Sequence, residues 1–188
     1  MRKIYLITGG ERSGKSIYAE RLALSLSPHP IYLATARIWD AEFRTRVDIH
    51  RARRGACWEN IEEEKLLSRH QVEGRTVLID CLTLWATNYF FDRCSCGHAG
   101  GDEQARAEAG VAEVNDTLDA LKQEFERFTA QDATFIFVTN EIGMGGVSPN
   151  ETQRRFTDLL GWFNQYVAQQ AHEVVLMVSG IPVPIKHS

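Results

Sequence analysis

The sequence has little of what marks a membrane, secreted or disulfide-rich protein. No apolar run reaches the ~18 residues that a membrane-spanning helix needs, and no basic-then-apolar leader follows Met1. The four cysteines, at positions 57, 81, 94 and 96, are too few for a disulfide framework in a chain of 188 residues. We therefore expect reduced thiols and a soluble, cytoplasmic protein without a membrane span.

An excess of positive charge is also missing. The formal net charge is −4, whereas a protein that binds DNA or RNA through its phosphates needs a basic face. Arginine is nevertheless concentrated in one stretch, where six arginines (37, 44, 46, 51, 53 and 54) outnumber three acidic residues. This local patch fits a small polyanionic ligand better than it fits a nucleic acid.

The sequence does contain a complete G-x-x-x-x-G-K-[ST] motif, directly after the apolar residues 4–7. In such a loop the backbone N–H groups surround phosphate oxygens, the lysine contacts the terminal phosphates and the hydroxyl ligates Mg²⁺. A chance glycine turn is the alternative, but the order of strand, loop and helix favours a nucleoside triphosphate site. Its residues are Gly9, Gly10, Glu11, Arg12, Ser13, Gly14, Lys15 and Ser16.

Short apolar runs alternate with helical patterns along the chain, which is typical of βα units around a parallel sheet. We predict strands at residues 3–8, 31–34, 76–80, 134–139 and 173–179. Two later stripes of apolar residues at steps of three and four predict helices with core-facing sides, the first of which would also fit a short coiled coil. The expected fold is α/β, with one P-loop domain over residues 1–188. The stripes are Val111, Val114, Leu118, Leu121, Phe125 and Phe128, then Phe156, Leu159, Leu160, Phe163 and Val167.

Two predicted strands end in carboxylates. Asp80 closes the buried-strand pattern of residues 77–80, a position from which a P-loop protein places an acidic group beside Mg²⁺. Glu141 follows residues 134–139 and would also lie at the carboxyl edge of the sheet, as a general base, a Mg²⁺ ligand or a turn cap. Thr83 and Asn88 follow on the next helix and fit ordinary polar surface equally well.

A histidine lies among the clustered arginines. If residues 44–54 are helical, Arg46, His50 and Arg54 share one face. Neighbouring positive charge disfavours imidazolium, which leaves His50 neutral and able to attack a phosphorus atom while the arginines neutralise the phosphates. A basic lid that closes on phosphates and a solvated face are the alternatives that this spacing leaves open.

The segment from Cys94 to Gly101 interrupts the helical pattern. Its Cys94-x-Cys96-x-His98 spacing suggests zinc, but a tetrahedral site needs four ligands and zinc motifs usually separate their cysteines by two or more residues. A solvated loop between two helices explains the segment better.

Several motifs together resemble one family. They are the P-loop, Ala34-Thr35-Ala36, His50-Arg51-x-x-Arg54 followed by Trp58 and Glu62, Asp80-Cys81-Leu82-Thr83, the run from Val138 to Gly145, and Val178-Ser179-Gly180-Ile181. The combination resembles the bifunctional adenosylcobinamide kinase / adenosylcobinamide-phosphate guanylyltransferases of cobalamin biosynthesis, over nearly the whole chain. The P-loop is generic, whereas the His-Arg segment joined to Thr-Asn-Glu-Ile-Gly-Met-Gly is specific.

This resemblance implies two reactions and a RecA-like core. ATP or GTP would phosphorylate the aminopropanol hydroxyl of adenosylcobinamide, and GTP would then guanylylate His50 before the GMP passes to the cobinamide phosphate. The resemblance also implies Mg²⁺ as cofactor and a homo-oligomer, by analogy a trimer. It places the nucleotide contacts, besides the P-loop, at Thr35, Ala36, Arg37, Arg51, Ala52, Arg53, Arg54, Glu62 and Asp80.

The sequence departs from the family pattern after Arg54, where Gly55 and Asn60 replace the usual proline and threonine, and the segment from Cys94 to Gly101 resembles an insertion. Two other functions compete with the bifunctional enzyme. A plain small-molecule kinase would use the arginine segment as a lid. A GTP-dependent switch is disfavoured because the sequence has no Asn-Lys-x-Asp motif for guanine.

Overall fold

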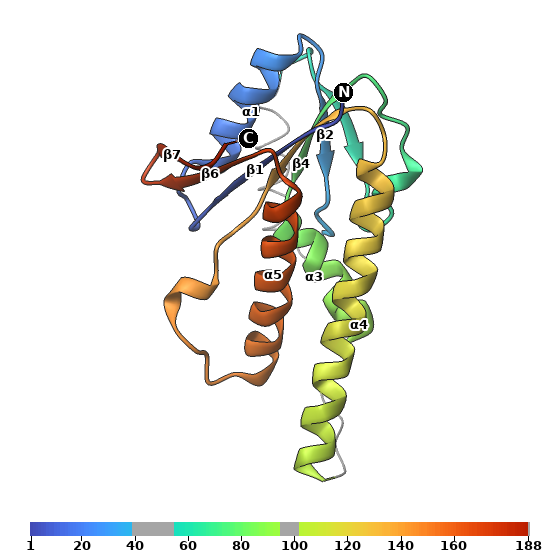
Figure 1. Ribbon diagram of the computed structural model, residues 1–188, viewed down its shortest axis with the longest axis vertical. Helices are drawn as coiled ribbons and strands as arrows, with labels where there is room; N and C mark the ends of the chain where they lie inside the picture. The colour runs from blue at the N-terminus through green and yellow to red at the C-terminus, as the bar shows by residue number, and fades with distance from the viewer. Residues whose placement is uncertain (39–54, 95–101, 188) are drawn as a thin grey trace.

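A single mixed sheet organises the protein, for which a computed structural model describes residues 1–38, 55–94 and 102–187. The described strands run in the order β3-β2-β4-β5-β1-β6-β7, so the P-loop strand lies inside the sheet (Figure 1). All neighbouring pairs are parallel except β6 and β7. The strands are β1 (Lys3–Gly9), β2 (Ile31–Ala34), β3 (Glu59–Glu62), β4 (Thr76–Asp80), β5 (Thr134–Val138), β6 (Glu173–Val178) and β7 (Ile181–Lys186).

The five predicted strands are confirmed to within one residue at each end. They were recognisable because strands with helices on both faces are buried on both faces and read as continuous apolar runs. In β1, for example, every residue after Lys3 is buried. Two edge strands, β3 and β7, were not predicted.

Helices cover both faces of the sheet. The helix α1 (Lys15–Leu26) packs on one face, where Ala19 and Ala23 join a cluster with strand residues such as Ile7. The helices α3 (Leu82–Arg93), α4 (Glu103–Thr129) and α5 (Glu151–Gln170) cover the other face (Figure 1). The predicted α/β class with a mostly parallel sheet is therefore confirmed, and the RecA-like core stays a prediction.

The two apolar stripes are core faces, as predicted, with one exception. Leu121, Phe125 and Phe128 of α4 are at most 1 % exposed, and they pack with Phe163 of α5 in the same cluster. The prediction for Val111 is wrong, because this side chain is 57 % exposed. The first turns of α4 extend beyond the sheet in Figure 1, so this end of the helix has less of the protein to pack against.

Cys57, Cys81 and Cys94 form no disulfide with one another in the part of the chain that the structure describes. Cys94 is buried and its Sγ lies 3.7 Å from Thr117 Oγ1, while Cys96 and His98 lie outside the described residues. Within the described ranges, none of the helices has the length and apolar character to cross a membrane.

Candidate active site

The loop between β1 and α1 has the backbone shape of a phosphate site. Gly14, with φ 95°, precedes the first residue of α1, and Gly9 has φ 149°. A Cβ on Gly9 would lie 2.5 Å from the carbonyl oxygen of Met177, so glycine is required here for conformation and for space. The first N–H groups of α1 have no acceptor within the helix and carry its positive end, which suits a bound anion.

Lys15 lies folded over this loop. Its Nζ donates to the carbonyl oxygen of Gly10 and lies 3.4 Å from Ser13 Oγ, and the residue is only 7 % exposed. Burial lowers the pKa of Lys15, and the carboxylates of Asp80 and Glu11 partly oppose this effect. The ammonium group therefore occupies the loop itself, where a phosphate oxygen would replace the Gly10 carbonyl as its partner.

The turn between β6 and β7 supports the P-loop from outside. Gly180 donates its backbone N–H to the carbonyl oxygen of Ser13 at 2.9 Å. A Cβ on Gly14 would come within 3.3 Å of Gly180 Cα, so the two backbones approach closely. The sequence contained this turn as Ser179-Gly180, but nothing in the pattern indicated that it contacts the P-loop.

Asp80 and Glu141 both emerge at the carboxyl edge of the sheet, as predicted from their positions after strands. The backbone N–H of Glu141 donates to the carbonyl oxygen of Gly9 at 3.0 Å, which fixes Glu141 beside the P-loop. Asp80 ends β4, on the far side of β5 from β1, and its Oδ2 accepts a hydrogen bond from Tyr32 at 2.8 Å. Asp80 and Glu141 thus follow two strands, β4 and β5, at the same edge of the sheet as the phosphate loop.

Thr35 joins the ends of β2 and β4. Its hydroxyl donates to the carbonyl oxygen of Cys81 at 2.8 Å and accepts from the Cys81 N–H at 2.9 Å, and the residue is fully buried. Burial raises the pKa of the Cys81 thiol to about 12, so this thiol stays neutral. Thr35 therefore positions the backbone next to Asp80, and its own contact with nucleotide stays a prediction.

Asn88 was compatible with a surface position in the sequence, but it is 1 % exposed. Its Nδ2 donates to the carbonyl oxygens of Thr35 at 2.7 Å and Glu64 at 2.9 Å, so α3 holds the segments that follow β2 and β3. A polar residue six positions into a helix carries no sequence signal for such a role. Only the folded arrangement identifies it.

A second polar network holds the end of β5. Thr83 Oγ1 accepts from the N–H of Asn140 at 2.9 Å, and Asn164 Nδ2 donates to the carbonyl oxygen of Asn140 at 3.2 Å. Thr139 adds a 2.8 Å bond from its hydroxyl to Asn164 Oδ1. Helices α3 and α5 therefore fix the residue that precedes Glu141.

Arg37 lies in an ion-pair cluster on the α3 side of the edge. Its guanidinium donates to Glu64 at 2.7 Å and to both carboxylate oxygens of Asp92 at 2.8 and 3.0 Å. These bonds raise the pKa of Arg37 and hold the pKa of Asp92 well below its usual range, an effect to which Lys65 contributes at 3.0 Å. A contact between Arg37 and nucleotide would have to compete with these carboxylates.

Of the remaining predicted nucleotide contacts, the structure describes Glu62, Ala36 and Ser16. Glu62 ends β3 opposite Ala34, and Ala36 separates Thr35 from Arg37. Ser16 is half-buried at the second residue of α1, within the P-loop. His50, Arg51, Ala52, Arg53 and Arg54 lie outside the described residues, and their roles stay predictions.

Comparison with known proteins covers almost the entire chain. Residues 5–185 match the family described as "Cobinamide kinase / cobinamide phosphate guanyltransferase". The bifunctional adenosylcobalamin biosynthesis protein CobP of Pseudomonas aeruginosa is 38 % identical over 96 % of both chains. The bifunctional protein CobU of Escherichia coli is 36 % identical over 96 % of this chain and 98 % of its own. Among solved structures, the flagellar accessory protein FlaH of Methanocaldococcus jannaschii matches 99 % of this chain and 79 % of its own with a TM-score of 0.46 and 15 % identity.

Proposed function

The chain belongs to the cobinamide kinase / cobinamide phosphate guanyltransferase family, and from this premise we propose how its residues divide the two reactions. It is a transferase of adenosylcobalamin biosynthesis, with kinase and guanylyltransferase activities. The observation that carries this conclusion is the family match over residues 5–185, which includes the P-loop and both carboxyl-edge acids. We infer that one domain, residues 1–188, carries both activities.

In the kinase reaction, the P-loop binds the triphosphate of ATP or GTP and Lys15 contacts its terminal phosphates. The aminopropanol hydroxyl of adenosylcobinamide attacks the γ-phosphorus, the bond to the bridging oxygen breaks, and the nucleoside diphosphate leaves. Glu141 is the group we assign to accept the hydroxyl proton, because its backbone is bonded to Gly9 of the P-loop. Arg12 and Glu11 are proposed as further contacts of this nucleotide, and Arg37, which follows β2, as a contact of the GTP used in the guanylyl transfer.

Mg²⁺ is proposed as cofactor of these transfers, and the chain offers a suitable set of oxygen donors. Mg²⁺ in such sites takes one or two carboxylates together with substrate phosphates. Ser16 Oγ and Asp80 would hold it, since the hydroxyl belongs to the P-loop and the carboxylate is close enough to Lys15 to influence its pKa. When bound, the ion neutralises charge that develops on the phosphates.

In the guanylyltransferase reaction, we propose His50 as the nucleophile. Its ring nitrogen attacks the α-phosphorus of GTP, pyrophosphate leaves, and a phosphoramidate forms. A phosphate oxygen of adenosylcobinamide phosphate then attacks the same phosphorus, which releases His50 and gives adenosylcobinamide-GDP. Arg51, Ala52, Arg53, Arg54 and Glu62 are proposed to surround the nucleotide in this step, which the neighbouring cationic side chains support by charge.

Labelling with GTP that carries a radioactive α-phosphate tests this division. The wild-type protein should retain acid-labile label after denaturation, and His50→Asn should retain none while still phosphorylating adenosylcobinamide. Lys15→Ala should lose phosphorylation because its phosphate contact is gone. An unlabelled wild-type protein, or a labelled His50→Asn protein, contradicts the covalent route, and mass analysis of the corrinoid product then shows whether a phosphate or a GDP adduct forms.

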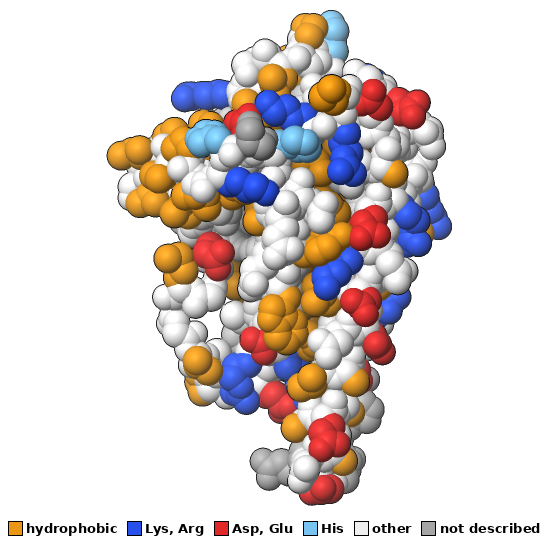
Figure 2. Space-filling model, viewed as in Figure 1, with side chains coloured by type: hydrophobic (Ala, Val, Ile, Leu, Met, Phe, Trp, Pro, Cys, Tyr) orange, Lys and Arg blue, Asp and Glu red, His pale blue; other side chains and the backbone are white. Residues whose placement is uncertain are grey.

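We further propose a homo-oligomer, a trimer by family analogy. The exposed apolar side chains of β7 support this proposal, because Ile181 is 65 %, Val183 40 % and Ile185 59 % exposed on an edge strand. Figure 2 shows hydrophobic side chains gathered over the end of the sheet formed by β6 and β7. Light scattering at micromolar concentration should give three times the chain mass of 21.3 kDa, and a monomer mass contradicts the proposal.

A further inference from the structure

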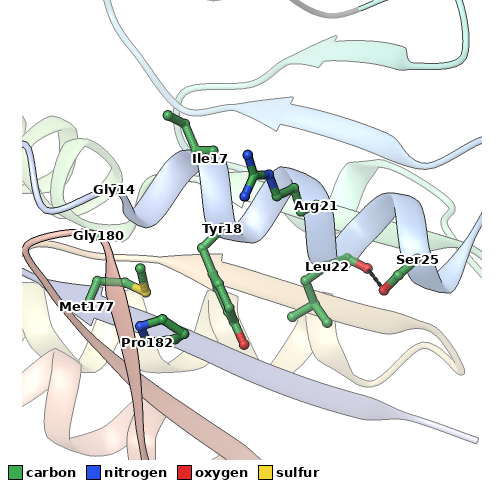
Figure 3. A pocket seen from close by; sticks show the side chains of 9 residues that line it. All are labelled: Gly14, Ile17, Tyr18, Arg21, Leu22, Ser25, Met177, Gly180 and Pro182. Carbon is green, nitrogen blue, oxygen red and sulfur yellow. Dashed lines mark hydrogen bonds between the residues drawn. The ribbon is translucent and has the colours of Figure 1, made fainter.

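A groove of about 520 Å³ lies between α1 and the β6–β7 hairpin, on the α1 face of the sheet. Tyr18 and Leu22 point from α1 toward Met177 and Pro182, which form the opposite wall (Figure 3). This volume lies within the range of about 300–1,000 Å³ that small-molecule sites occupy. None of the proposed catalytic groups accounts for it.

The groove is continuous with the phosphate loop. Gly14, which precedes α1, lines it, and so does Gly180, whose N–H is bonded to Ser13 of the loop. Ile17, two positions after Lys15, is also part of the lining. A triphosphate whose terminal phosphates reach Lys15 therefore has its α-phosphate end directed along the start of α1 toward this groove.

The chemistry of the walls suits a flat aromatic group. Ile17, Leu22, Met177 and Pro182 supply apolar surface, and the half-buried Tyr18 supplies a ring. Stacking of a nucleobase on an aromatic side chain contributes about 1–3 kcal/mol and does not depend on which base is bound. Arg21 and Ser25, which also line the groove, are exposed and supply its polar side chains.

The lining does not distinguish between purines. Guanine is selected by an acceptor for its N1–H and N2 amino group, and neither a carboxylate nor a carboxamide side chain is among the lining residues that the structure describes. The Ser25 hydroxyl is already bonded to the carbonyl oxygen of Leu22 at 2.7 Å. The lining side chains therefore give no basis for a preference between adenine and guanine.

We propose that the groove between α1 and the β6–β7 hairpin holds the purine nucleoside of the nucleotide that donates the γ-phosphoryl group. The inference rests on the proposed role of the P-loop as the triphosphate site of the kinase reaction. The base of the kinase nucleotide then lies on a surface that the guanylyl transfer need not share, because the groove has no carboxylate or carboxamide side chain that would select guanine for that step.

Calorimetric titration with two probes tests the proposal, namely inorganic tripolyphosphate and the β,γ-imido analogue of ATP. Pro182→Trp fills the groove, and Leu24→Trp is the matched control, because Leu24 is 43 % exposed on α1 and is not among the residues that line the groove. Pro182→Trp should weaken binding of the ATP analogue about 10- to 100-fold, as expected for the loss of one stacked base. Pro182→Trp should leave tripolyphosphate binding unchanged within about twofold, and Leu24→Trp should bind both probes like the wild type.

A second pair of variants guards against a folding defect in Pro182→Trp. Tyr18→Ala removes the ring and should weaken the analogue about tenfold, while Tyr18→Phe keeps the ring and should bind normally. If both probes bind the wild type but Pro182→Trp and Tyr18→Ala leave analogue affinity unchanged, or weaken both probes equally, the groove is not the base site. If tripolyphosphate itself fails to bind the wild type, the P-loop proposal falls first and the groove assignment falls with it.

Discussion

Replacement of Thr35 by valine should destabilise the protein, because the hydroxyl of this buried residue makes two hydrogen bonds to the backbone of Cys81. Valine has nearly the same shape, so the substitution removes the two hydrogen bonds to Cys81 without opening a cavity. The carbonyl oxygen of Cys81 keeps a partner, because Trp85 donates to it at 3.0 Å. The N–H of Cys81 loses its only described acceptor, and a buried donor left unpaired costs about 1–3 kcal/mol.

With the second lost bond, we expect Thr35→Val to lower the free energy of unfolding by about 2–3 kcal/mol. Thr35→Ser is the matched control, since it keeps the hydroxyl and removes one buried methyl group, at a cost of about 1 kcal/mol. For a chain of this length these values correspond to decreases in melting temperature of about 4–12 °C and 2–4 °C.

Urea unfolding followed by circular dichroism measures both differences at one temperature. The reasoning is refuted if Thr35→Val is as stable as Thr35→Ser, or more stable, because the two hydrogen bonds between Thr35 and Cys81 would then not stabilise the ends of β2 and β4. A native-like value for Thr35→Val together with a low value for Thr35→Ser would show that the methyl group, not the hydrogen bonds, carries the effect.

The other predictions concern the loop and its surroundings. Gly9→Ala should cost about 2–4 kcal/mol of stability, because Gly9 has a positive φ and an added Cβ would contact the β6 backbone. Gly10→Ala should change stability by less than about 0.5 kcal/mol, because its added Cβ meets nothing within 4 Å. Equal effects of the two variants in urea unfolding contradict this prediction. Nucleotide affinity should fall as the pH rises through the lowered pKa of Lys15, because the neutral amine no longer attracts the phosphates. Calorimetry in which the affinity decreases only above pH 10.5, the ordinary pKa of lysine, contradicts this prediction. Asp92→Asn should cost less than about 1 kcal/mol at pH 7 because the ion pairs are partly exposed. The pKa of Asp92 is lower in the folded protein than its value near 3.8 in the unfolded chain, so the ionised carboxylate stabilises the protein above about pH 4. The stability difference between wild type and Asp92→Asn should therefore shrink as the pH is lowered below about 4. A difference that grows in this range contradicts the assignment.

The inner strands and the P-loop were predictable because their local signals agree with their surroundings. A strand buried on both faces must be apolar throughout, and the motif from Gly9 to Ser16 imposes its own turn before α1. The two missed strands lie at the edges of the sheet. In β3 only Ile61 is apolar, and in β7 the prolines 182 and 184 argue against a strand, although prolines are tolerated at an edge.

The supports of the site were less predictable than its reactive groups. The sequence identifies Lys15 by its motif, and Asp80 and Glu141 by their position at or after the end of a predicted strand. It does not identify Asn88 and Gly180, because their roles depend on which distant carbonyl oxygen or N–H lies beside them in the folded protein. Local patterns report local geometry, and these contacts join segments that are far apart in the sequence.

The contact between Gly180 and Ser13 also bears on when the phosphate loop can reach its final conformation during synthesis of the chain. The phosphate loop is translated first, yet its outer brace is the turn that follows β6, and β1 itself lies between β5 and β6. A ribosome-bound chain that has exposed only its amino-terminal half thus presents the complete motif without the neighbours that shape it. We therefore expect the nucleotide site to form only once β6 and β7 have emerged, so that a translation product interrupted before them carries the motif without the folded site.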